Sequence, residues 1–209
     1  MYNSWGNIPE WSIPNEYIPN TVVSVIIAAR NEEDTIEKCI LSILNCNYPK
    51  SLLEIIVVDD HSTDQTNAII KKYTNQGIKL LNLIETTGKK QAISNAIQAS
   101  KGKLIICTDA DCIVSATWLN SIVSLYQSNS KRLIVAPIVY KSNTSIIQKF
   151  QFLDGINNMC VTAVGIDKQS FFLANGANFI YEKSLFNEIN GLDDSMHIPS
   201  GDDVFLIKK

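Results

Sequence analysis

The sequence lacks any apolar run long enough to cross a membrane. Its longest nearly apolar stretch, Val22–Ala29, is about eight residues long, whereas a transmembrane helix needs ~20. The start of the chain does not have the pattern of a signal peptide either. We therefore expect neither a membrane span nor a signal peptide within these 209 residues.

An excess of basic charge is also missing. The chain has 18 Lys and Arg against 21 Asp and Glu, which gives a net charge of −3 and a pI near 5.4. A nucleic-acid-binding domain needs a basic surface to neutralise phosphates, so we expect no nucleic-acid partner. The acidic balance instead suits a site that recruits cations.

Closely spaced cysteine pairs are the third absence. The five cysteines form no CxxC pair, most of them lie within apolar runs, and their number is odd. This pattern favours buried free thiols in a reducing compartment over disulfides or a zinc site. The cysteines are Cys39, Cys46, Cys107, Cys112 and Cys160.

Apolar residues, by contrast, are plentiful. Hydrophobic residues make up 45% of the chain and charged residues 19%, which is enough to bury one sizeable core and excludes disorder over most of the length. We expect one domain over residues 22–209, preceded by an extended lead-in over residues 1–21 with three of the six prolines. Trp5 and Trp11 either pack this lead-in on the domain as a strap, or the segment is a linker from an upstream element.

From Val22 onward, short β-branched runs alternate with amphipathic helical patterns. This alternation is typical of βαβ units and predicts an α/β fold with a mostly parallel central sheet flanked by helices. The Ser62–Gln65 stretch has the SxxQ spacing of a capping box that opens a helix. Strands are expected at 22–28, 53–58, 78–84, 103–108, 132–140 and 175–181. Helices are expected at 36–44, after 65, between 88 and 102, at 118–126, 144–164 and 182–190.

Acidic side chains follow two of the expected strands. Asp59 and Asp60 end one strand, and Asp109 and Asp111 follow another. In open α/β sheets, ligands bind beyond the carboxyl ends of the strands. Four carboxylates at one sheet edge would repel each other unless a cation or hydrogen-bond donors lay among them, and a hard divalent metal is the natural occupant.

The TDADC stretch places Asp109 and Asp111 two residues apart. In an extended backbone both side chains would point to the same side, roughly 6 to 7 Å apart. This spacing suits one carboxylate on a metal and the other on a neighbouring ligand group, with open metal positions for phosphates. The other interpretation of a lone DxD is an ordinary acidic turn.

Lys89 and the SGDDVF stretch supply further candidates. Lys89 stands at the start of an expected helix, where it either meets an anion or is part of a solvated helix start. In SGDDVF, Asp202 suits a helix cap, and Asp203 is the better candidate for a general base. His61, beside the acidic pair, is expected to be structural, and His197 to be a loop residue.

Several segments of the chain, in order, resemble the motifs of the family 2 inverting glycosyltransferases. They are SVIIAARNEEDTIEKCILSIL, EIIVVDDHSTDQT, GKKQAISNAI, GKLIICTDADCIVSATWL, NGANFIYEKSLFNEINGLDD and SGDDVF. The resemblance runs from about Val22 to Lys209. It implies the GT-A fold, a Rossmann-like nucleotide-diphospho-sugar transferase architecture. It also implies sugar transfer from a nucleoside diphosphate donor, usually a UDP-sugar, with inversion at the anomeric carbon.

The resemblance assigns roles to individual residues. Asp60 matches the aspartate that hydrogen-bonds the nucleotide base, and Ala28 and Arg30 match the end of the first strand in the base pocket. Lys89 matches the lysine of the family's GKAGALN-like segment. Asp109 matches the first DxD aspartate, near ribose and metal.

For the chemistry, the resemblance implies Mn²⁺ or Mg²⁺ on the donor diphosphate, held by Asp111 with Asp109 beside it. Asp203 matches the ED-motif aspartate that deprotonates the acceptor hydroxyl. In-line attack needs this base on the face opposite the departing diphosphate. The acceptor, a carbohydrate or a lipid-linked molecule, stays open. A domain on the cytoplasmic side, with membrane contact or a membrane anchor in a longer protein, is implied as well.

The sequence departs from the family pattern at four points. Gln91 replaces the glycine and Ser94 the asparagine of the GKAGALN-like segment, and Asp202 replaces the usual glutamate, so either Asp202 or Asp203 can be the base. The QxxRW-like motif of processive members does not occur before Lys209. We interpret the domain as truncated at its C-terminus, which leaves processivity and the acceptor open.

Three other functions compete with this interpretation. A receiver domain has about 120 residues and would place its acidic pair on its first strand. In this chain a full strand–helix unit precedes Asp59. A nucleotidyltransferase that makes sugar nucleotides would carry a glycine-rich basic loop after the first strand, where this chain has AARNEED. A catalytically inactive nucleotide-sugar-binding module stays open.

Overall fold

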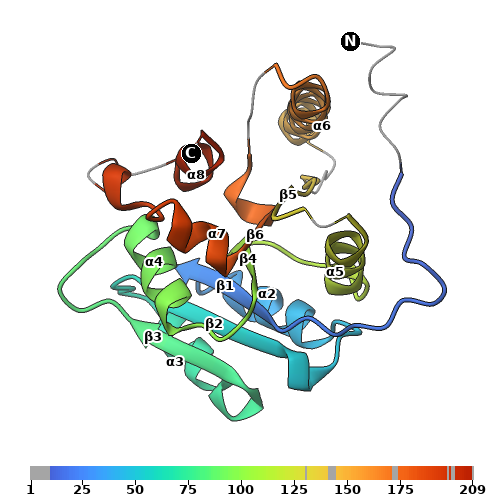
Figure 1. The fold of residues 1–209 in the computed structure, drawn as a ribbon. Helices are drawn as coiled ribbons and strands as arrows, with labels where there is room; N and C mark the ends of the chain where they lie inside the picture. Colours follow the sequence, from blue (N-terminus) through green and yellow to red (C-terminus); the bar gives the residue numbers. More distant parts are fainter. Residues whose placement is uncertain are drawn as a thin grey trace.

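A six-stranded sheet forms the centre of the molecule (Figure 1). The computed structural model describes residues 10–129, 131–140, 145–170, 174–196, 198 and 201–208. The strand order is β3-β2-β1-β4-β6-β5, in which β1 to β4 pair in parallel and β6 runs antiparallel to both β4 and β5. The expected mostly parallel sheet is therefore confirmed. The strands are β1 (Val23–Ala29), β2 (Leu53–Asp59), β3 (Ile78–Asn82), β4 (Leu104–Asp109), β5 (Leu133–Val135) and β6 (Phe179–Glu182).

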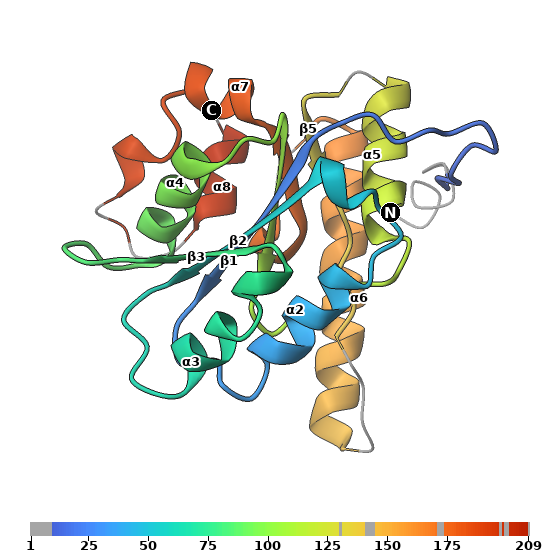
Figure 2. The ribbon, with the colours of Figure 1, turned by 90° about the horizontal axis from the view of Figure 1, so that it is seen from below.

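Helices cover both faces of the sheet (Figures 1 and 2). One face packs against α2 (Ile36–Leu44), α3 (Thr66–Lys71) and α5 (Trp118–Asn129). The other face packs against α4 (Lys89–Ala99), α7 (Lys183–Glu188) and α8 (Asp202–Lys208). Because both faces are covered, the central strands contain nearly continuous apolar runs, such as Val25–Ala29 of β1, rather than strict alternation.

The helix α6 (Ile146–Asp167) lies beyond the β5 edge (Figure 1). Its contact with the preceding segment is close at Gly155, where an added Cβ would lie 2.3 Å from Tyr140 Cδ2. Its N-terminal half keeps large apolar side chains exposed, among them Ile146, Ile147 and Phe150. None of the described helices combines the length and the apolar character that a membrane crossing requires.

Two local predictions are wrong. The helix α3 begins at Thr66, and its N-cap residue Gln65 makes no side-chain capping bond. The Ser62 hydroxyl instead accepts a hydrogen bond from the Asn31 amide at 3.0 Å, so a contact between two loops replaces the expected capping box. The strand expected at 132–140 is only three residues long. Pro137 has no N–H for the ladder, which explains why pairing stops beside it.

The lead-in and the cysteines follow the sequence interpretation where the structure describes them. The Trp11 indole donates to Ser124 Oγ on α5 at 2.9 Å, as a strap would, whereas Trp5 lies outside the described residues. None of the five cysteines forms a disulfide, and three of them are buried. The buried ones are Cys39, Cys46 and Cys107.

Candidate functional site

A pocket of about 410 Å³ opens at the carboxyl ends of β1, β2 and β4. These ends are level, because β1 pairs Ala29 with Asp59 of β2 and Ala28 with Asp109 of β4. The loops that follow the three strands therefore converge on one place. The pocket is lined by Ala28, Ala29, Arg30, Glu32, Asp60, Gly88, Lys89, Asp109, Ala110 and Asp111. Every residue to which the family resemblance assigns a role in donor or metal binding is among them.

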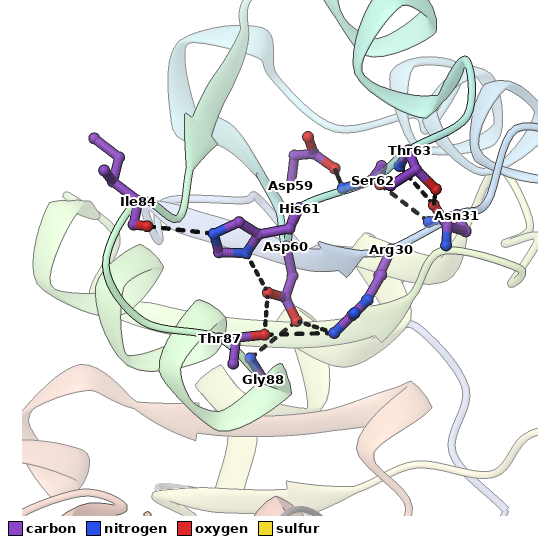
Figure 3. A network of polar contacts seen from close by, with 10 residues as sticks. All are labelled: Arg30, Asn31, Asp59, Asp60, His61, Ser62, Thr63, Ile84, Thr87 and Gly88. Atoms are coloured by element: carbon purple, nitrogen blue, oxygen red, sulfur yellow. Dashed lines mark hydrogen bonds and ion pairs between the residues drawn. The ribbon is translucent and has the colours of Figure 1, made fainter.

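Asp60 is held by a dense set of donors (Figure 3). Its Oδ1 accepts from the Thr87 hydroxyl at 2.9 Å and lies 3.0 Å from His61 Nδ1. Its Oδ2 accepts from the Gly88 amide at 2.9 Å and lies 3.7 Å from Arg30 Nη1. Burial raises the pKa of Asp60, but these hydrogen bonds outweigh it and lower the pKa below its usual value. The carboxylate is therefore ionised at neutral pH.

Two loops are joined to fix the ends of β1 and β2 (Figure 3). The Thr63 amide donates to Asn31 Oδ1 at 2.8 Å, and the Glu32 amide donates to Thr66 Oγ1 at 2.7 Å. Asn31 and His61 both adopt left-handed backbone conformations, with φ of 55° and 57°. These turns direct Arg30 and Asp60 toward the same pocket.

Asp59 does not take part in the pocket, which corrects the prediction that four carboxylates gather. Its Oδ1 accepts from the Ser62 amide at 3.3 Å and its Oδ2 from Asn67 Nδ2 at 2.8 Å. Adjacent strand residues point to opposite faces, so only one of Asp59 and Asp60 can line the pocket. The acidic residues that line it are Asp60, Asp109 and Asp111, together with Glu32 from the loop after β1.

The DxD segment is a turn rather than an extended chain. The strand β4 ends at Asp109, and the Cys112 amide donates to the Asp109 carbonyl at 3.2 Å. The expected extended spacing of Asp109 and Asp111 is therefore wrong, although both still line the pocket. Lys89 Nζ lies 2.6 Å from Asp109 Oδ1 and forms an ion pair with it.

A second pocket, of about 590 Å³, shares Asp109 and Asp111 with the first. The sequence interpretation missed it, because residues 137–140 have the pattern of a strand. Trp118 Nε1 donates to Asn178 Oδ1 at 3.1 Å, and Asn178 Nδ2 donates to the Pro137 carbonyl at 3.0 Å. These bonds fix part of its wall. It is lined by Thr108, Asp109, Asp111, Cys112, Ile113, Val114, Ser115, Trp118, Pro137, Ile138, Val139, Tyr140, Asn175, Ala177 and Asn178.

Asp203, the predicted base, does not line the first pocket. Its Oδ2 accepts from the Gly176 amide at 2.9 Å, and Gly176 lies between two residues that line the second pocket, Asn175 and Ala177. The structure therefore places Asp203 beside the second pocket. The Asp202 side chain and His197 lie outside what the structure describes.

The two lysines at the start of α4 differ in surroundings. Lys89 reaches the pocket, whereas Lys90 is buried and its Nζ lies 4.2 Å from the centre of the Phe205 ring. A cation over an aromatic face is stabilised by the ring quadrupole. Lys90 therefore links α4 to α8, whereas Lys89 lines the pocket and is paired there with Asp109.

The donor set in the first pocket fits a hard divalent cation. Asp109 and Asp111 provide carboxylate oxygens, the ligands that Mg²⁺ and Mn²⁺ take. Among the described residues, no group of three or more His, Cys, Asp or Glu could hold a metal on its own. A cation at this DxD would therefore take its remaining ligands from a bound phosphate group and water.

Comparison with known sequences gives a consistent picture. The family model described as "Glycosyl transferase family 2" matches residues 24–189. The probable glycosyltransferase YdaM of Bacillus subtilis is 29% identical over 198 residues, which cover 90% of this chain and 46% of YdaM. The chain thus spans about half the length of that relative.

Solved structures resemble the fold. The mannosyltransferase PcManGT from Pyrobaculum calidifontis, in complex with GDP-Man and Mn²⁺, superposes with a TM-score of 0.68 at 20% identity, over 90% of this chain and 52% of that one. S. aureus TarS 1-349 in complex with UDP-GlcNAc gives a TM-score of 0.59 at 20% identity, over 81% of this chain and 47% of that one. This likeness confirms the expected GT-A fold.

Proposed function

The chain belongs to glycosyl transferase family 2, and from this premise we propose that it binds a nucleoside diphosphate sugar, with UDP as the expected nucleotide. The sugar would pass to an acceptor hydroxyl with inversion, as the family resemblance implies. One observation carries the proposal: a single pocket at the strand ends collects the six residues predicted for donor and metal. They are Ala28, Arg30, Asp60, Lys89, Asp109 and Asp111.

In this proposal the nucleobase lies against Asp60 and Ala28. Asp60 is buried and ionised, so it accepts hydrogen bonds from base N–H groups and cannot donate. Arg30, whose side chain is 58% exposed, has room to move over the bound base. The diphosphate then lies near Lys89, which supplies a positive charge at the start of α4.

Asp109 and Asp111 would hold Mn²⁺ or Mg²⁺ together with the donor phosphates. When bound, this cation neutralises the charge that grows on the leaving diphosphate. PcManGT, in complex with GDP-Man and Mn²⁺, supports this assignment by analogy. Lys89 adds a fixed positive charge within the same pocket.

The acceptor would enter through the second pocket, which shares Asp109 and Asp111 with the first. Asp203, on α8 beside this pocket, would take the proton of the attacking hydroxyl. In this proposal the base lies beside the second pocket and the leaving diphosphate lies in the first. In-line displacement requires the two on opposite faces of the sugar. Asp202 is the alternative base.

We further propose that the whole protein acts in polysaccharide or glycolipid synthesis, on the cytoplasmic side and in contact with a membrane. Among the relatives are a poly-β-1,6-N-acetyl-D-glucosamine synthase, named for a polysaccharide product, and a β-monoglucosyldiacylglycerol synthase, named for a glycolipid product. These matches cover 42% and 23% of those proteins.

A thermal-shift screen of nucleotide sugars with Mn²⁺ tests the donor class. Ligand binding to the folded state raises the melting temperature with the logarithm of ligand concentration over Kd. We expect UDP-sugars at millimolar concentration to raise it and nucleosides without phosphate to have little effect. A screen in which no nucleotide sugar shifts the melting temperature would contradict the proposal. Binding without sugar transfer, tested in the whole protein, would favour the inactive binding module.

A further inference from the structure

The His61 ring lies between two hydrogen-bond acceptors (Figure 3). Its Nδ1 is 3.0 Å from Asp60 Oδ1, and its Nε2 is 3.3 Å from the Ile84 carbonyl oxygen. Asp60 is ionised, and a carbonyl oxygen has no proton to give. Both bonds therefore need the proton to come from the ring.

A neutral imidazole cannot make both bonds. It carries one N–H, so its other nitrogen would direct a lone pair at either Asp60 or the Ile84 carbonyl. An imidazolium carries two N–H groups and satisfies both acceptors. The arrangement of Asp60, His61 and Ile84 is thus the one expected for protonated His61.

The charges around the ring agree with this protonation state. The bond to Asp60 and then the bond to the Ile84 carbonyl raise the pKa of His61, while the Arg30 guanidinium lowers it by a smaller amount. Asp59 is engaged by Asn67. Glu85, the charged residue of the facing loop, is exposed. The net direction of the pKa shift is upward.

Protonated His61 joins the end of β2 to the loop that follows β3. That loop, residues 84–88, already reaches Asp60 through the Thr87 hydroxyl and the Gly88 amide. His61 adds a bond from the other side of the same carboxylate and a second bond to the start of the loop. Three donors, from two segments, thereby fix the orientation of Asp60 beside Gly88 and Lys89 in the pocket.

We propose that His61 is a positioning residue, whose imidazolium holds Asp60 and loop 84–88 in the arrangement that the nucleotide base requires. The inference rests on the proposed function of the pocket. When His61 loses its proton, one of its two hydrogen bonds is lost, and Asp60 and loop 84–88 become less ordered. Ordering them again when the base binds then costs free energy. Donor affinity therefore falls as pH rises through the pKa of His61.

The linkage between the proton and the donor is reciprocal. If protonated His61 favours nucleotide binding, the bound nucleotide raises the pKa of His61 further. A rise of about 0.5 to 1 pH unit corresponds to a three- to tenfold weaker affinity well above the pKa than below it. The direction of the pKa change distinguishes this positioning role from the opposite one. If protonated His61 instead blocked Asp60, its bond to Asp60 would have to break on binding, and the nucleotide would then lower the pKa of His61.

NMR titration of the imidazole protons measures the pKa directly. The chain has only two histidines, His61 and His197, so the His197→Asn variant reports His61 alone. Without nucleotide, we expect the His61 pKa to lie above the usual ~6.5 and to fall in Asp60→Asn. With UDP and diamagnetic Mg²⁺ added, we expect it to rise. An unchanged or lowered pKa on UDP binding would overturn the inference.

Calorimetry between pH 6 and pH 8 gives the second readout. We expect the Kd for UDP with Mn²⁺ to increase about three- to tenfold over this range in wild type and in His197→Asn. His61→Asn suits the left-handed backbone at φ 57°, and we expect it to remove this part of the pH dependence. Circular dichroism and the melting temperature establish that the variant is folded. The same pH dependence in His61→Asn as in wild type would also overturn the inference.

The two proposals fail in different ways. If UDP binds with the same affinity whether or not His61 is protonated, the positioning role is wrong, but the proposed donor site is unaffected. If UDP fails to bind at any pH with Mn²⁺ present, the proposed function fails and the inference fails with it.

Discussion

Lys89 Nζ lies 2.6 Å from Asp109 Oδ1, so the first residue of α4 faces the last residue of β4 across the pocket. The buried face of α4, which includes Ala92 and Ile93, fixes the helix against the sheet and thereby fixes Lys89. The lysine supplies positive charge to a carboxylate that a metal would otherwise neutralise. Lys89 and a divalent cation therefore compete for Asp109 until a diphosphate is present.

This competition predicts the metal affinity of a Lys89 variant. Lys89→Met frees Asp109, so we expect Mn²⁺ alone to bind about two- to fivefold more tightly, a size typical of losing one partly exposed ion pair. UDP affinity should fall in the same variant because the diphosphate loses a cation. Electron paramagnetic resonance of free Mn²⁺ and calorimetry with UDP measure the two effects. Lys71→Met, at an exposed position on α3, is the control, and opposite or absent changes in Lys89→Met would contradict the ion-pair account.

The position of Asp203 predicts a separation of donor binding from transfer. Asp203→Asn retains an oxygen that can accept from the Gly176 amide, so the fold and the UDP affinity should stay close to wild type. Transfer should fall about 10²- to 10⁴-fold, the range for loss of a general base. Radiolabelled sugar transfer in the whole protein and UDP calorimetry check both halves. Asp154→Asn on α6 is the exposed control, and undiminished transfer by Asp203→Asn would move the base to another residue, with Asp202 the first to test.

Gly102 predicts a stability effect far from the pocket. An added Cβ would lie 2.4 Å from the Ser24 backbone nitrogen and 2.8 Å from the Val23 carbonyl carbon, atoms of β1 that cannot move without disturbing the sheet. We expect Gly102→Ala to lower the free energy of unfolding by about 1–3 kcal/mol, as overpacking does. Urea denaturation measures it.

Gly77 provides the comparison for this variant. Its φ is 93°, and nothing lies within 4 Å of an added Cβ. Gly77→Ala should therefore cost only backbone strain, on the order of 1 kcal/mol. Equal stability of Gly102→Ala and wild type would show that β1 and the turn before β4 are not in close contact.

The buried thiols predict slow alkylation. Burial raises the pKa of Cys39 to about 12, and nearby Cys112, Asp111, Asp109 and Glu32 add to the shift. Because the thiolate is the nucleophile, Cys39 should stay unmodified by iodoacetamide at pH 8 in the native protein and react after unfolding. Mass spectrometry of the labelled peptides, with the half-buried Cys160 as the internal comparison, checks this. Native labelling of Cys39 as fast as that of Cys160 would contradict its burial.

The pocket could be predicted from the sequence because of how parallel strands end. Asp60 and Asp109 follow apolar strands, and the level ends of β1, β2 and β4 bring such residues together whatever the loops do. Lys89 was predictable because its helix follows a glycine and packs by a regular apolar stripe. These features depend on local pattern and on one general rule of α/β folds.

Other features depend on contacts that the local pattern does not contain. The second pocket forms because residues 137–140 leave the sheet after Pro137, although their apolar alternation is typical of a strand. The hydrogen bonding of the His61 ring depends on the carbonyl of Ile84, which lies 23 residues further along the chain. The orientation of Asp59 away from the pocket was, in contrast, available from the alternation of side chains along a strand.

The most direct test of the central claim is a calorimetric titration of UDP in the presence of Mn²⁺ and again with excess chelator. Asp111→Asn is the site variant, and Asp34→Asn, at an exposed position, is the control. We expect UDP to bind wild type and Asp34→Asn at least about tenfold more tightly with Mn²⁺ than with chelator, because the cation offsets repulsion between the phosphates and the DxD carboxylates. This gain should be lost in Asp111→Asn. Equal UDP affinity with Mn²⁺ and with chelator, or an undiminished gain in Asp111→Asn, would contradict the assignment of this pocket as a metal-dependent nucleotide-sugar site.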